Sequence, residues 1–209
     1  MYNATAHQEH DLDQLHRQML QTRLVTLVSH GEQGLLASHI PVLLDPHEGP
    51  YGTVYAHLAR ANRQWQDLQG ASQTLLVFPG PDAYVSPVYY PSKADNPRVV
   101  PTWNYVAVHA QGPAEVIHDT SRLLDIVSRL TDRHEQARSQ PWQVADAPAD
   151  YIDAMLRAIV GVRVPIERLQ GARKLSQNRS AMDIEGVRTG LAGSIDPLDN
   201  QLAAHMRQP

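Results

Sequence analysis

The chain lacks cysteine altogether, and this absence excludes several kinds of chemistry at once. Without a thiol among its 209 residues, it can form no disulfide, no thiolate zinc site, no cysteine-held iron–sulfur cluster and no thiol nucleophile. Lysine is almost as scarce, because only Lys93 and Lys174 occur and the other sixteen of the 18 basic residues are arginine. Any catalysis or cofactor binding must therefore depend on other side chains.

Long apolar runs and an excess of positive charge are also missing. No apolar stretch approaches the roughly 20 residues of a membrane-spanning helix, and the polar first twenty residues contain no apolar core of a signal peptide. We therefore expect a cytoplasmic protein. The 18 basic and 22 acidic residues give a net charge of -4, which disfavours a broad DNA-binding surface because DNA affinity depends on Lys and Arg that neutralise phosphates.

Sequence motifs of nucleotide, hydrolase and metal sites are absent as well. No GxGxxG, Walker A, GxSxG or HExxH sequence occurs. The eleven histidines are scattered without the spacing that is typical of metal sites. The sequence therefore predicts no metal site and assigns no catalytic residue.

The chain does contain a series of short segments with strand-like alternation, separated by turn residues. The predicted strands are 24–29, 35–44, 53–58, 73–78, 102–111, 114–117 and 160–166, and the predicted helices are 11–20, 59–68, 121–135 with Thr120 as its cap, and 149–158. Residues 78–98 contain five prolines and are expected to form a loop that could include a brief strand at 83–86. This order favours a mainly β fold, an antiparallel barrel with inserted helices packed outside, over a doubly wound sheet.

We expect residues 1–180 to form one barrel domain and residues 181–209 to form a C-terminal helical tail packed on it. Three segments combine polar and aromatic residues where such a barrel would place its rim: 56–65, 100–112 and 171–180. In the first, His57 and Arg60 leave a strand and begin a helix, where Arg60 and backbone amides near Ala59 and Asn62 can hold a phosphate. An ordinary strand-to-helix turn with an exposed arginine is the alternative.

The other two segments suit different parts of a ligand. Thr102, Asn104 and Tyr105 offer hydrogen-bonding groups and Trp103 a flat apolar surface, a combination that suits a planar heteroaromatic ligand. A barrel core with a hydrogen-bonded rim explains the same residues equally well. The third segment is rich in polar donors and holds Lys174, although a polar surface loop would look the same. At Lys93 and Lys174 a compact ammonium group can meet a phosphate or a ring oxygen.

With these segments in this order, the chain resembles the PaiB family of FMN-binding negative transcriptional regulators. The resemblance extends through the sequences LLASHIPVLL, AHLARANRQW, FPGPDAYVSPVYYPSK, VPTWNYVAVHAQG, AIVGVRVPIERLQGARKLSQNRS and GVRTGL. It implies an FMN-binding split β-barrel and a homodimer with FMN in a groove at the subunit interface. The implied cofactor-binding residues are His57, Ala59, Arg60, Asn62, Lys93, Thr102, Trp103, Asn104, Tyr105, Lys174, Ser176 and Gln177.

The chain departs from the family pattern at four places around the expected pocket. Arg63 stands where the family commonly has proline, Val88 and Tyr89 replace a usual Ser or Thr and a Trp, and residues 172–173 replace a pair such as Lys-Trp. These departures bear on the ligand and its orientation more than on the fold.

The resemblance leaves three functional hypotheses. The first is a flavin-dependent redox or flavin-sensing protein, an FMN-dependent oxidoreductase if it is an enzyme, which could also act as a negative transcriptional regulator. The second is a heme-binding split-barrel enzyme related to piperazate synthases, with His57, His39 or His109 as axial ligand. The third is a DNA-binding repressor without catalytic activity, which the acidic composition disfavours.

Overall fold

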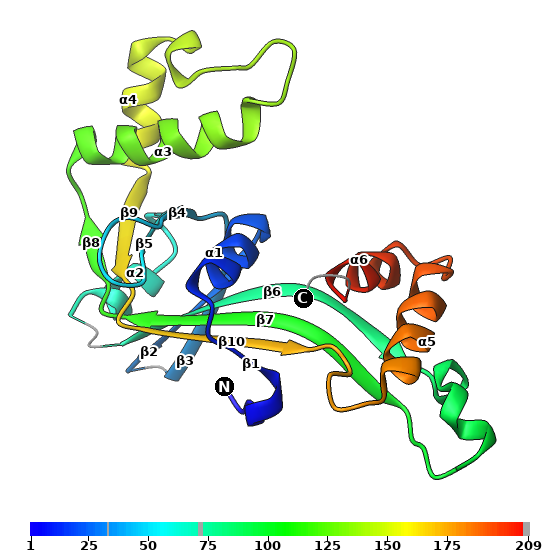
Figure 1. Cartoon of the computed structure of the whole chain (residues 1–209). Helices are drawn as coiled ribbons and strands as arrows, with labels where there is room; N and C mark the ends of the chain where they lie inside the picture. The colour runs from blue at the N-terminus through cyan, green and yellow to red at the C-terminus, as the bar shows by residue number, and fades with distance from the viewer. Residues whose placement is uncertain (33, 71–72, 207–209) are drawn as a thin grey trace. The chain divides into compact units, whose positions relative to one another are not determined.

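The computed structural model describes residues 1–32, 34–70 and 73–206 (Figure 1). Its helices and strands are, in chain order, η1 (Thr5–His7), β1 (Gln8–Glu9), α1 (Leu12–Gln21), β2 (Val25–Gly31), β3 (Gly34–Ile40), β4 (Leu43–Asp45), β5 (Thr53–Ala59), α2 (Gln64–Leu68), β6 (Thr74–Val85), η2 (Pro87–Tyr89), η3 (Pro91–Ala94), β7 (Thr102–Gly112), β8 (Glu115–Ile117), α3 (Thr120–Glu135), η4 (Val144–Asp146), α4 (Ala149–Arg157), β9 (Ile159–Pro165), β10 (Arg168–Lys174), α5 (Ala181–Ala192) and α6 (Pro197–His205).

The chain divides into two compact units, each built from separate stretches of sequence. Unit 1 consists of residues 1–18, 79–108 and 170–209, and unit 2 consists of residues 19–78 and 109–169. The boundaries between these stretches fall within α1, β6, β7 and β10. Each unit has an apolar cluster of its own.

Unit 2 contains the antiparallel sheet β4-β5-β9-β8 and the antiparallel strands β2 and β3. Strands β5 and β9 pair over seven residues, with Ala56 opposite Val162 and Leu58 opposite Val160. These four side chains are buried, because alternate residues of a strand point to the same face. The apolar alternation of the sequence therefore produces one buried face of this sheet.

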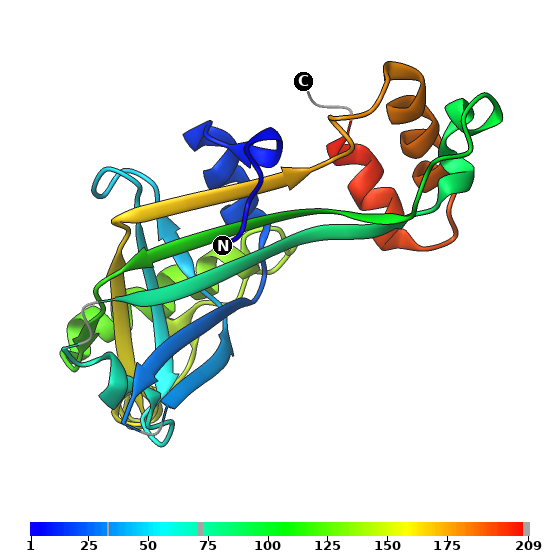
Figure 2. The same ribbon diagram turned by 90° about the horizontal axis from the view of Figure 1, so that it is seen from below.

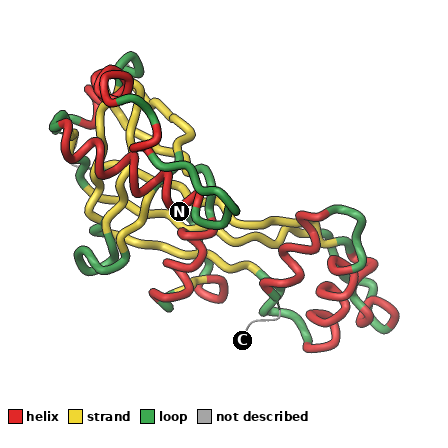
Figure 3. The backbone as a smooth tube through the Cα atoms, turned by 90° about the horizontal axis from the view of Figure 1, so that it is seen from above, coloured by secondary structure: helices red, strands yellow, loops and turns green. Residues whose placement is uncertain are grey.

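Helix α3 covers the other face of the same sheet (Figure 3). Its buried stripe is Leu123, Ile126 and Leu130, at the spacing of an amphipathic helix. Gly161 of β9 permits this packing, because a Cβ atom at residue 161 would lie 3.0–3.3 Å from side chains of β8 and α3. The helix is capped by Asp119, whose carboxylate accepts the Arg122 amide, so the prediction of Thr120 as cap was wrong by one residue.

Unit 1 contains the neighbouring strands β1, β10, β7 and β6 and the helices α5 and α6. One apolar cluster holds its strands and helices together, formed by Ala83, Val85, Tyr90, Val106, Leu175, Val187, Leu191, Leu202 and Ala203. Both helices are drawn on one side of β6 and β7 (Figure 1). Residues 207–209 of the expected C-terminal tail lie outside the described residues.

Two glycines explain how α5 approaches the segment between β6 and β7. A Cβ atom at Gly186 would lie 2.2 Å from the Tyr89 carbonyl oxygen, and one at Gly190 would lie 2.3 Å from the Tyr89 ring. Beside them, Asp183 accepts hydrogen bonds from the Ser92 amide at 3.1 Å and the Ser92 hydroxyl at 2.8 Å. The GVRTGL sequence is therefore a packing motif that fastens residues 89–92 to α5.

Four secondary-structure predictions are corrected by the structure. The strand predicted at 35–44 is two strands, β3 and β4, which belong to different sheets and are separated at Pro41 and Val42. Strand β6 continues to Val85, where a loop was expected. Its prolines lie beyond residues 75–77, the part of β6 that pairs with β2, so their missing N–H groups cost no hydrogen bond to β2. Residues 168–174, whose polar pattern gave no strand signal, form β10, which lies between β1 and β7 in its sheet. Helix α2 begins at Gln64 instead of residue 59, since Ala59 still pairs with Ile159.

Candidate functional site

In unit 1, the end of β10 brings two predicted site residues to β7. The Lys174 ammonium group donates to the Thr102 hydroxyl at 2.7 Å. The Asn104 amide Nδ2 donates to the Ser176 hydroxyl at 2.8 Å. Four of the predicted residues, separated by 72 positions in each pair, therefore form two adjacent side-chain contacts.

The two faces of β7 differ in what they offer to a ligand. Asn104 is fully buried and Val106 belongs to the core below α5 and α6, whereas Trp103 on the opposite face is 54% exposed. Trp103 makes an edge contact with Tyr84 of β6, with ring centroids 6.2 Å apart, and Tyr84 is 48% exposed. One ligand lying on the open face could thus contact Trp103 and Tyr105, but not the buried Asn104.

The turn after β10 is held in an unusual backbone conformation. Ser176 has a φ of 66°, and it is the non-glycine residue with positive φ in the part of the chain that the structure describes. This left-handed region costs energy for residues other than glycine. Gln177 stabilises the turn, because its side chain accepts from the Leu175 amide at 2.7 Å and donates to the Arg173 carbonyl.

Lys93, the other lysine, lies in η3 of unit 1 and is exposed. Its side chain makes no hydrogen bond or ion pair with the residues that the structure describes, whereas its backbone amide donates to the Tyr90 carbonyl at 3.2 Å. The Lys174 ammonium group therefore has a hydrogen-bond partner in the described part of the chain, and the Lys93 ammonium group does not.

The remaining predicted residues lie in unit 2, where Arg60 has structural partners. Its guanidinium group donates to the carbonyls of Arg157 at 2.8 Å and Ile159 at 2.9 Å, and its amide donates to Ala158 at 2.7 Å. Arg157 ends α4, so Arg60 satisfies carbonyl groups at a helix C-terminus, where positive charge is favourable. The expected phosphate site at a helix start is not formed at residues 59–62.

Asn62 and its neighbour Gln64 connect the turn before α2 to the β2–β3 hairpin. Asn62 donates to the Ser38 hydroxyl at 3.0 Å and accepts from the Gln64 amide at 3.0 Å. The buried Gln64 side chain donates to the carbonyls of Leu27 at 3.1 Å and Leu36 at 3.2 Å. Sequence reasoning missed Gln64; the only signal was a glutamine two residues after Asn62 in the AHLARANRQW motif.

His57 lies on the face of β5 that α3 covers. It pairs with Gly161 and shares its face with Tyr55, which packs against Ile126 and Leu130. Burial lowers the pKa of His57, and its buried Nδ1 atom has no hydrogen-bond partner in the described part of the chain. A neutral imidazole beneath a helix fits packing better than contact with a ligand.

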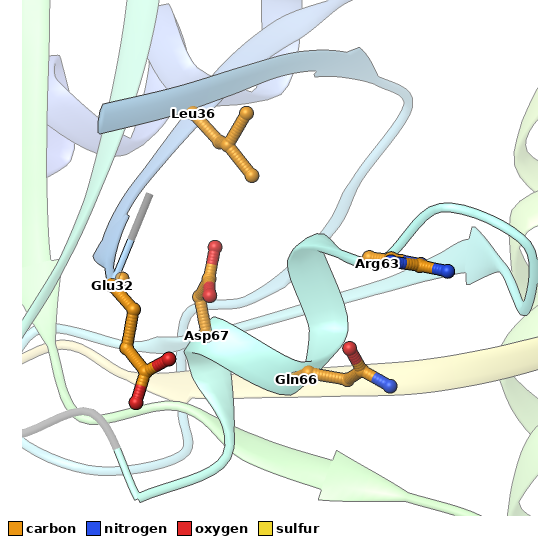
Figure 4. Close-up of a pocket in the computed structure, with 6 residues that line it drawn as sticks. Glu32, Leu36, Arg63, Gln66 and Asp67 are labelled. Carbon is orange, nitrogen blue, oxygen red and sulfur yellow. The ribbon is translucent and has the colours of Figure 1, made fainter. Parts of the chain in front are cut away.

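A pocket of about 360 Å³ in unit 2 contains none of the predicted site residues. It is lined by Gly31, Glu32, Leu36, Arg63, Gln66 and Asp67. Figure 4 shows the charged ends of Glu32, Arg63 and Asp67 pointing in different directions. Two carboxylates at one pocket repel a phosphate group, so this pocket does not fit FMN.

Two further features are missing from the described ranges, 1–32, 34–70 and 73–206. No cluster of three or more His, Asp or Glu side chains suited to a metal ion occurs in them. None of their helices is long and apolar enough to cross a membrane.

Comparison with solved structures defines the class of protein. The flavocytochrome Anf3 from Azotobacter vinelandii matches with a TM-score of 0.61 and 16% identity, over 85% of this chain and 74% of that one. The FAD and heme binding protein from Mycobacterium smegmatis matches with a TM-score of 0.59 and 14% identity, over 90% of this chain and 80% of that one. The protein has the split-barrel fold, as the sequence predicted.

Comparison of sequences defines the family. Residues 1–168 match the family model described as "Putative FMN-binding domain". The protease synthase and sporulation protein PAI 2 of Bacillus subtilis is 32% identical over 176 residues, which cover 84% of this chain and 82% of that protein. An uncharacterised protein of Aspergillus fumigatus is 36% identical over 197 residues, covering 75% of this chain and 76% of that protein. The chain belongs to this FMN-binding family, and the predicted PaiB resemblance is confirmed.

The predicted cofactor, FMN, is the one named in the family description. FMN has a planar ring system and an anionic phosphate, and unit 1 offers groups suited to both, the exposed Trp103 ring and the Lys174 ammonium. The matched residues end at 168, so the case for Lys174, Ser176 and Gln177 depends on their contacts. The residues of unit 1 therefore fit the cofactor better than the acidic pocket of unit 2.

Proposed function

We propose that the protein binds FMN at unit 1 and uses it in a redox or flavin-sensing role. The observation that carries this proposal is the Lys174–Thr102 contact of 2.7 Å at the first residue of β7. The next residue, Trp103, is half exposed on the opposite face of the same strand. An ammonium group and an exposed aromatic ring match the two chemical ends of FMN. A ligand that contacts both has to pass around the start of β7, because they lie on opposite faces of the strand. Family membership supports the same cofactor.

Each residue has a distinct proposed role. Trp103 and Tyr105 provide the surface for the isoalloxazine ring, with Tyr84 extending it, and Lys174 binds the phosphate through a charge-assisted hydrogen bond. Bound FMN supplies hydride and single-electron chemistry, and the surrounding protein groups tune its potential. No side chain is required as a nucleophile.

We further propose that a second copy of the chain completes the site. Trp103 and Tyr84 are 54% and 48% exposed, and a ring stacked on them would keep its other side in water. Aromatic residues that are exposed together are typical of binding surfaces. We expect light scattering after size exclusion to give the mass of a dimer, and Trp103→Ser to increase the monomer fraction; a monomeric wild-type protein would contradict the dimer.

Titration with FMN and riboflavin tests the phosphate contact, because riboflavin lacks the phosphate. We expect Lys174→Ala to weaken FMN binding about 10- to 100-fold, because a hydrogen bond between charged groups is lost. Riboflavin binding should stay unchanged. The matched control is Arg138→Ala, which removes one positive charge at an exposed ion pair of unit 2. Equal losses for FMN and riboflavin would place Lys174 at the ring instead of the phosphate.

Heme is the second candidate cofactor, favoured by the similarity in fold to the FAD and heme binding protein of M. smegmatis. The candidate axial ligands are His57, His39 and His109. His57 lies beneath α3, His39 contacts the Thr26 hydroxyl at 3.1 Å, and burial lowers the pKa of His109. Titration with hemin that produces a sharp Soret band, abolished by one of three His→Ala variants, would support heme.

A direct transcriptional role stays a prediction, and a gel shift on DNA upstream of the protein's own coding sequence tests it. Specific repression requires binding that survives moderate salt and depends on sequence. Binding of any DNA that disappears in modest salt would contradict specific repression.

A further inference from the structure

The buried contact between Asn104 and Ser176 lies beside the Lys174–Thr102 contact and has no part in the proposed function. We propose that Asn104 and Ser176 are positioning residues that direct the Lys174 side chain toward Thr102, and that neither contacts the flavin. The role of the positioned lysine in FMN binding rests on the proposed function. The positioning itself is a property of the protein alone.

The direction of the chain shows why a special turn is needed here. Strands β7 and β10 run in opposite directions (Figure 2), so a straight continuation of β10 beyond Lys174 would move away from Asn104. Instead, Ser176 meets Asn104, two residues further along β7 than Thr102. The chain therefore turns back directly after Lys174, and the left-handed Ser176, with its φ of 66°, lies in this turn.

Burial separates Asn104 and Ser176 from residues that could touch a ligand. Asn104 is 0% exposed and Ser176 is 4% exposed, whereas Lys174 is partly exposed. The Asn104 Oδ1 atom is buried and has no hydrogen-bond partner among the residues that the structure describes. Leaving a buried acceptor unpaired is costly, so packing alone does not explain an asparagine at this position.

The turn has its own support, so that its geometry does not depend on a ligand. Gln177 bonds to the Leu175 amide and the Arg173 carbonyl, which fixes the residues on either side of Lys174. The Asn104–Ser176 contact then connects this fixed turn to β7. Removing it should leave the turn formed but free to shift relative to Thr102.

The scarcity of lysine makes the test direct. A ¹H–¹⁵N correlation spectrum of lysine ammonium groups contains two signals, from Lys93 and Lys174, which Lys93→Arg assigns. We expect the Lys174 signal to be slow in hydrogen exchange and displaced from that of the unpartnered Lys93. In Asn104→Ala and in Ser176→Gly, we expect it to exchange faster and to move to the position of the Lys93 signal.

Ser176→Gly keeps the protein foldable, because glycine adopts positive φ without strain. If the two residues act as one unit, the double variant should shift the Lys174 signal no further than either single variant. The control is Asn200→Ala, which removes another asparagine of unit 1 that donates to the carbonyls of Leu191 and Ser194 at 3.0 Å. It should lower stability without moving the Lys174 signal.

An unchanged Lys174 signal in both single variants would overturn the positioning role, whatever the cofactor. In a second measurement, we expect Asn104→Ala and Ser176→Gly to lower FMN affinity about tenfold and to leave riboflavin affinity unchanged. Loss of affinity for both flavins to the same degree would instead place Asn104 or Ser176 in contact with the ring and contradict the proposal. If the wild-type protein binds no FMN, the proposed function fails while the spectra still decide the positioning role.

Discussion

At the scale of single residues, hydrogen-bond partners decide which polar groups are available to a ligand. Arg60 and Lys174 were both expected at the phosphate, but they differ in the structure. The Arg60 guanidinium group donates to two carbonyls, whereas Lys174 donates to a hydroxyl group that can also serve a ligand. Helix capping explains the contacts of Arg60, but it does not explain the contact of Lys174.

We expect Arg60→Ala to lower the free energy of unfolding by about 1 kcal/mol, because two exposed hydrogen bonds at the end of α4 are lost. Urea denaturation checks this value. Arg157→Ala is the matched control, since it removes a positive charge at the same helix end without those bonds, and its loss should be smaller. An Arg60→Ala protein as stable as the wild type would contradict the capping role.

The sequence identified the types of residue at the site but not their contacts. Thr102 and Lys174, like Asn104 and Ser176, are separated by 72 positions, and no local pattern indicates such a pairing. The burial of His57 beneath α3 was equally invisible, because a histidine that alternates with Tyr55 along a strand looks the same on either face. Tertiary packing, which these patterns do not contain, decides both.

At the scale of helices and strands, apolar alternation predicted most segments, and exceptions have physical reasons. Strand β10 has the polar sequence RLQGARK and forms through pairing with its neighbours. Strand β6 contains Pro79 and Pro81 where local rules predict a loop. Close packing of α5 depends on Gly186 and Gly190. From the sequence, these two glycines were known only as part of the GVRTGL motif of the family resemblance, and their packing role was not predicted.

Packing of α5 predicts the effect of adding a single methyl group. Gly190→Ala should lower the free energy of unfolding by about 1–3 kcal/mol through overpacking against Tyr89, although alanine is the better helix former by about 1 kcal/mol. Thermal or urea unfolding measures it. Gly193→Ala, where the nearest atoms lie 3.5 Å away, is the control. A Gly190→Ala protein more stable than the wild type would show that α5 does not pack closely on Tyr89.

Acid sensitivity is predicted for the sheet β4-β5-β9-β8. Glu48 accepts hydrogen bonds from the Tyr55 hydroxyl at 2.6 Å and from Arg163 at 2.6 and 3.1 Å. These bonds lower the pKa of Glu48 from its ordinary value of 4.5, with the Tyr55 hydroxyl making the largest contribution. A carboxylate with a depressed pKa stabilises the folded state above about pH 4.5, and this stabilisation is lost as the pH falls further.

We therefore expect Glu48→Gln to be less stable than the wild type at pH 7 and to lose less stability between pH 5 and pH 3. Urea denaturation at several pH values measures both. Glu32→Gln is the control, because its carboxylate makes no hydrogen bond or ion pair with the described part of the chain. Parallel pH profiles for Glu48→Gln and the wild type would exclude Glu48 as a source of acid sensitivity.

At the scale of the whole molecule, membership of the FMN-binding family and the split-barrel fold agree with what the sequence indicated. The similarity of long motifs in the same order made both predictable from one sequence. The division into a barrel domain of residues 1–180 and a helical tail stays a prediction. So does the homodimer, which we propose from the exposed aromatic face of unit 1 and the resemblance.

The most direct test of the proposed FMN site is a binding titration of the wild-type protein with FMN, riboflavin and hemin, followed by absorption and flavin fluorescence. We predict saturable FMN binding with one FMN per chain, weaker riboflavin binding because the phosphate contact to Lys174 is missing, and no Soret band with hemin. Failure of FMN to bind at a saturable site, or a sharp Soret band with hemin, would contradict the central claim that this protein is an FMN-binding protein.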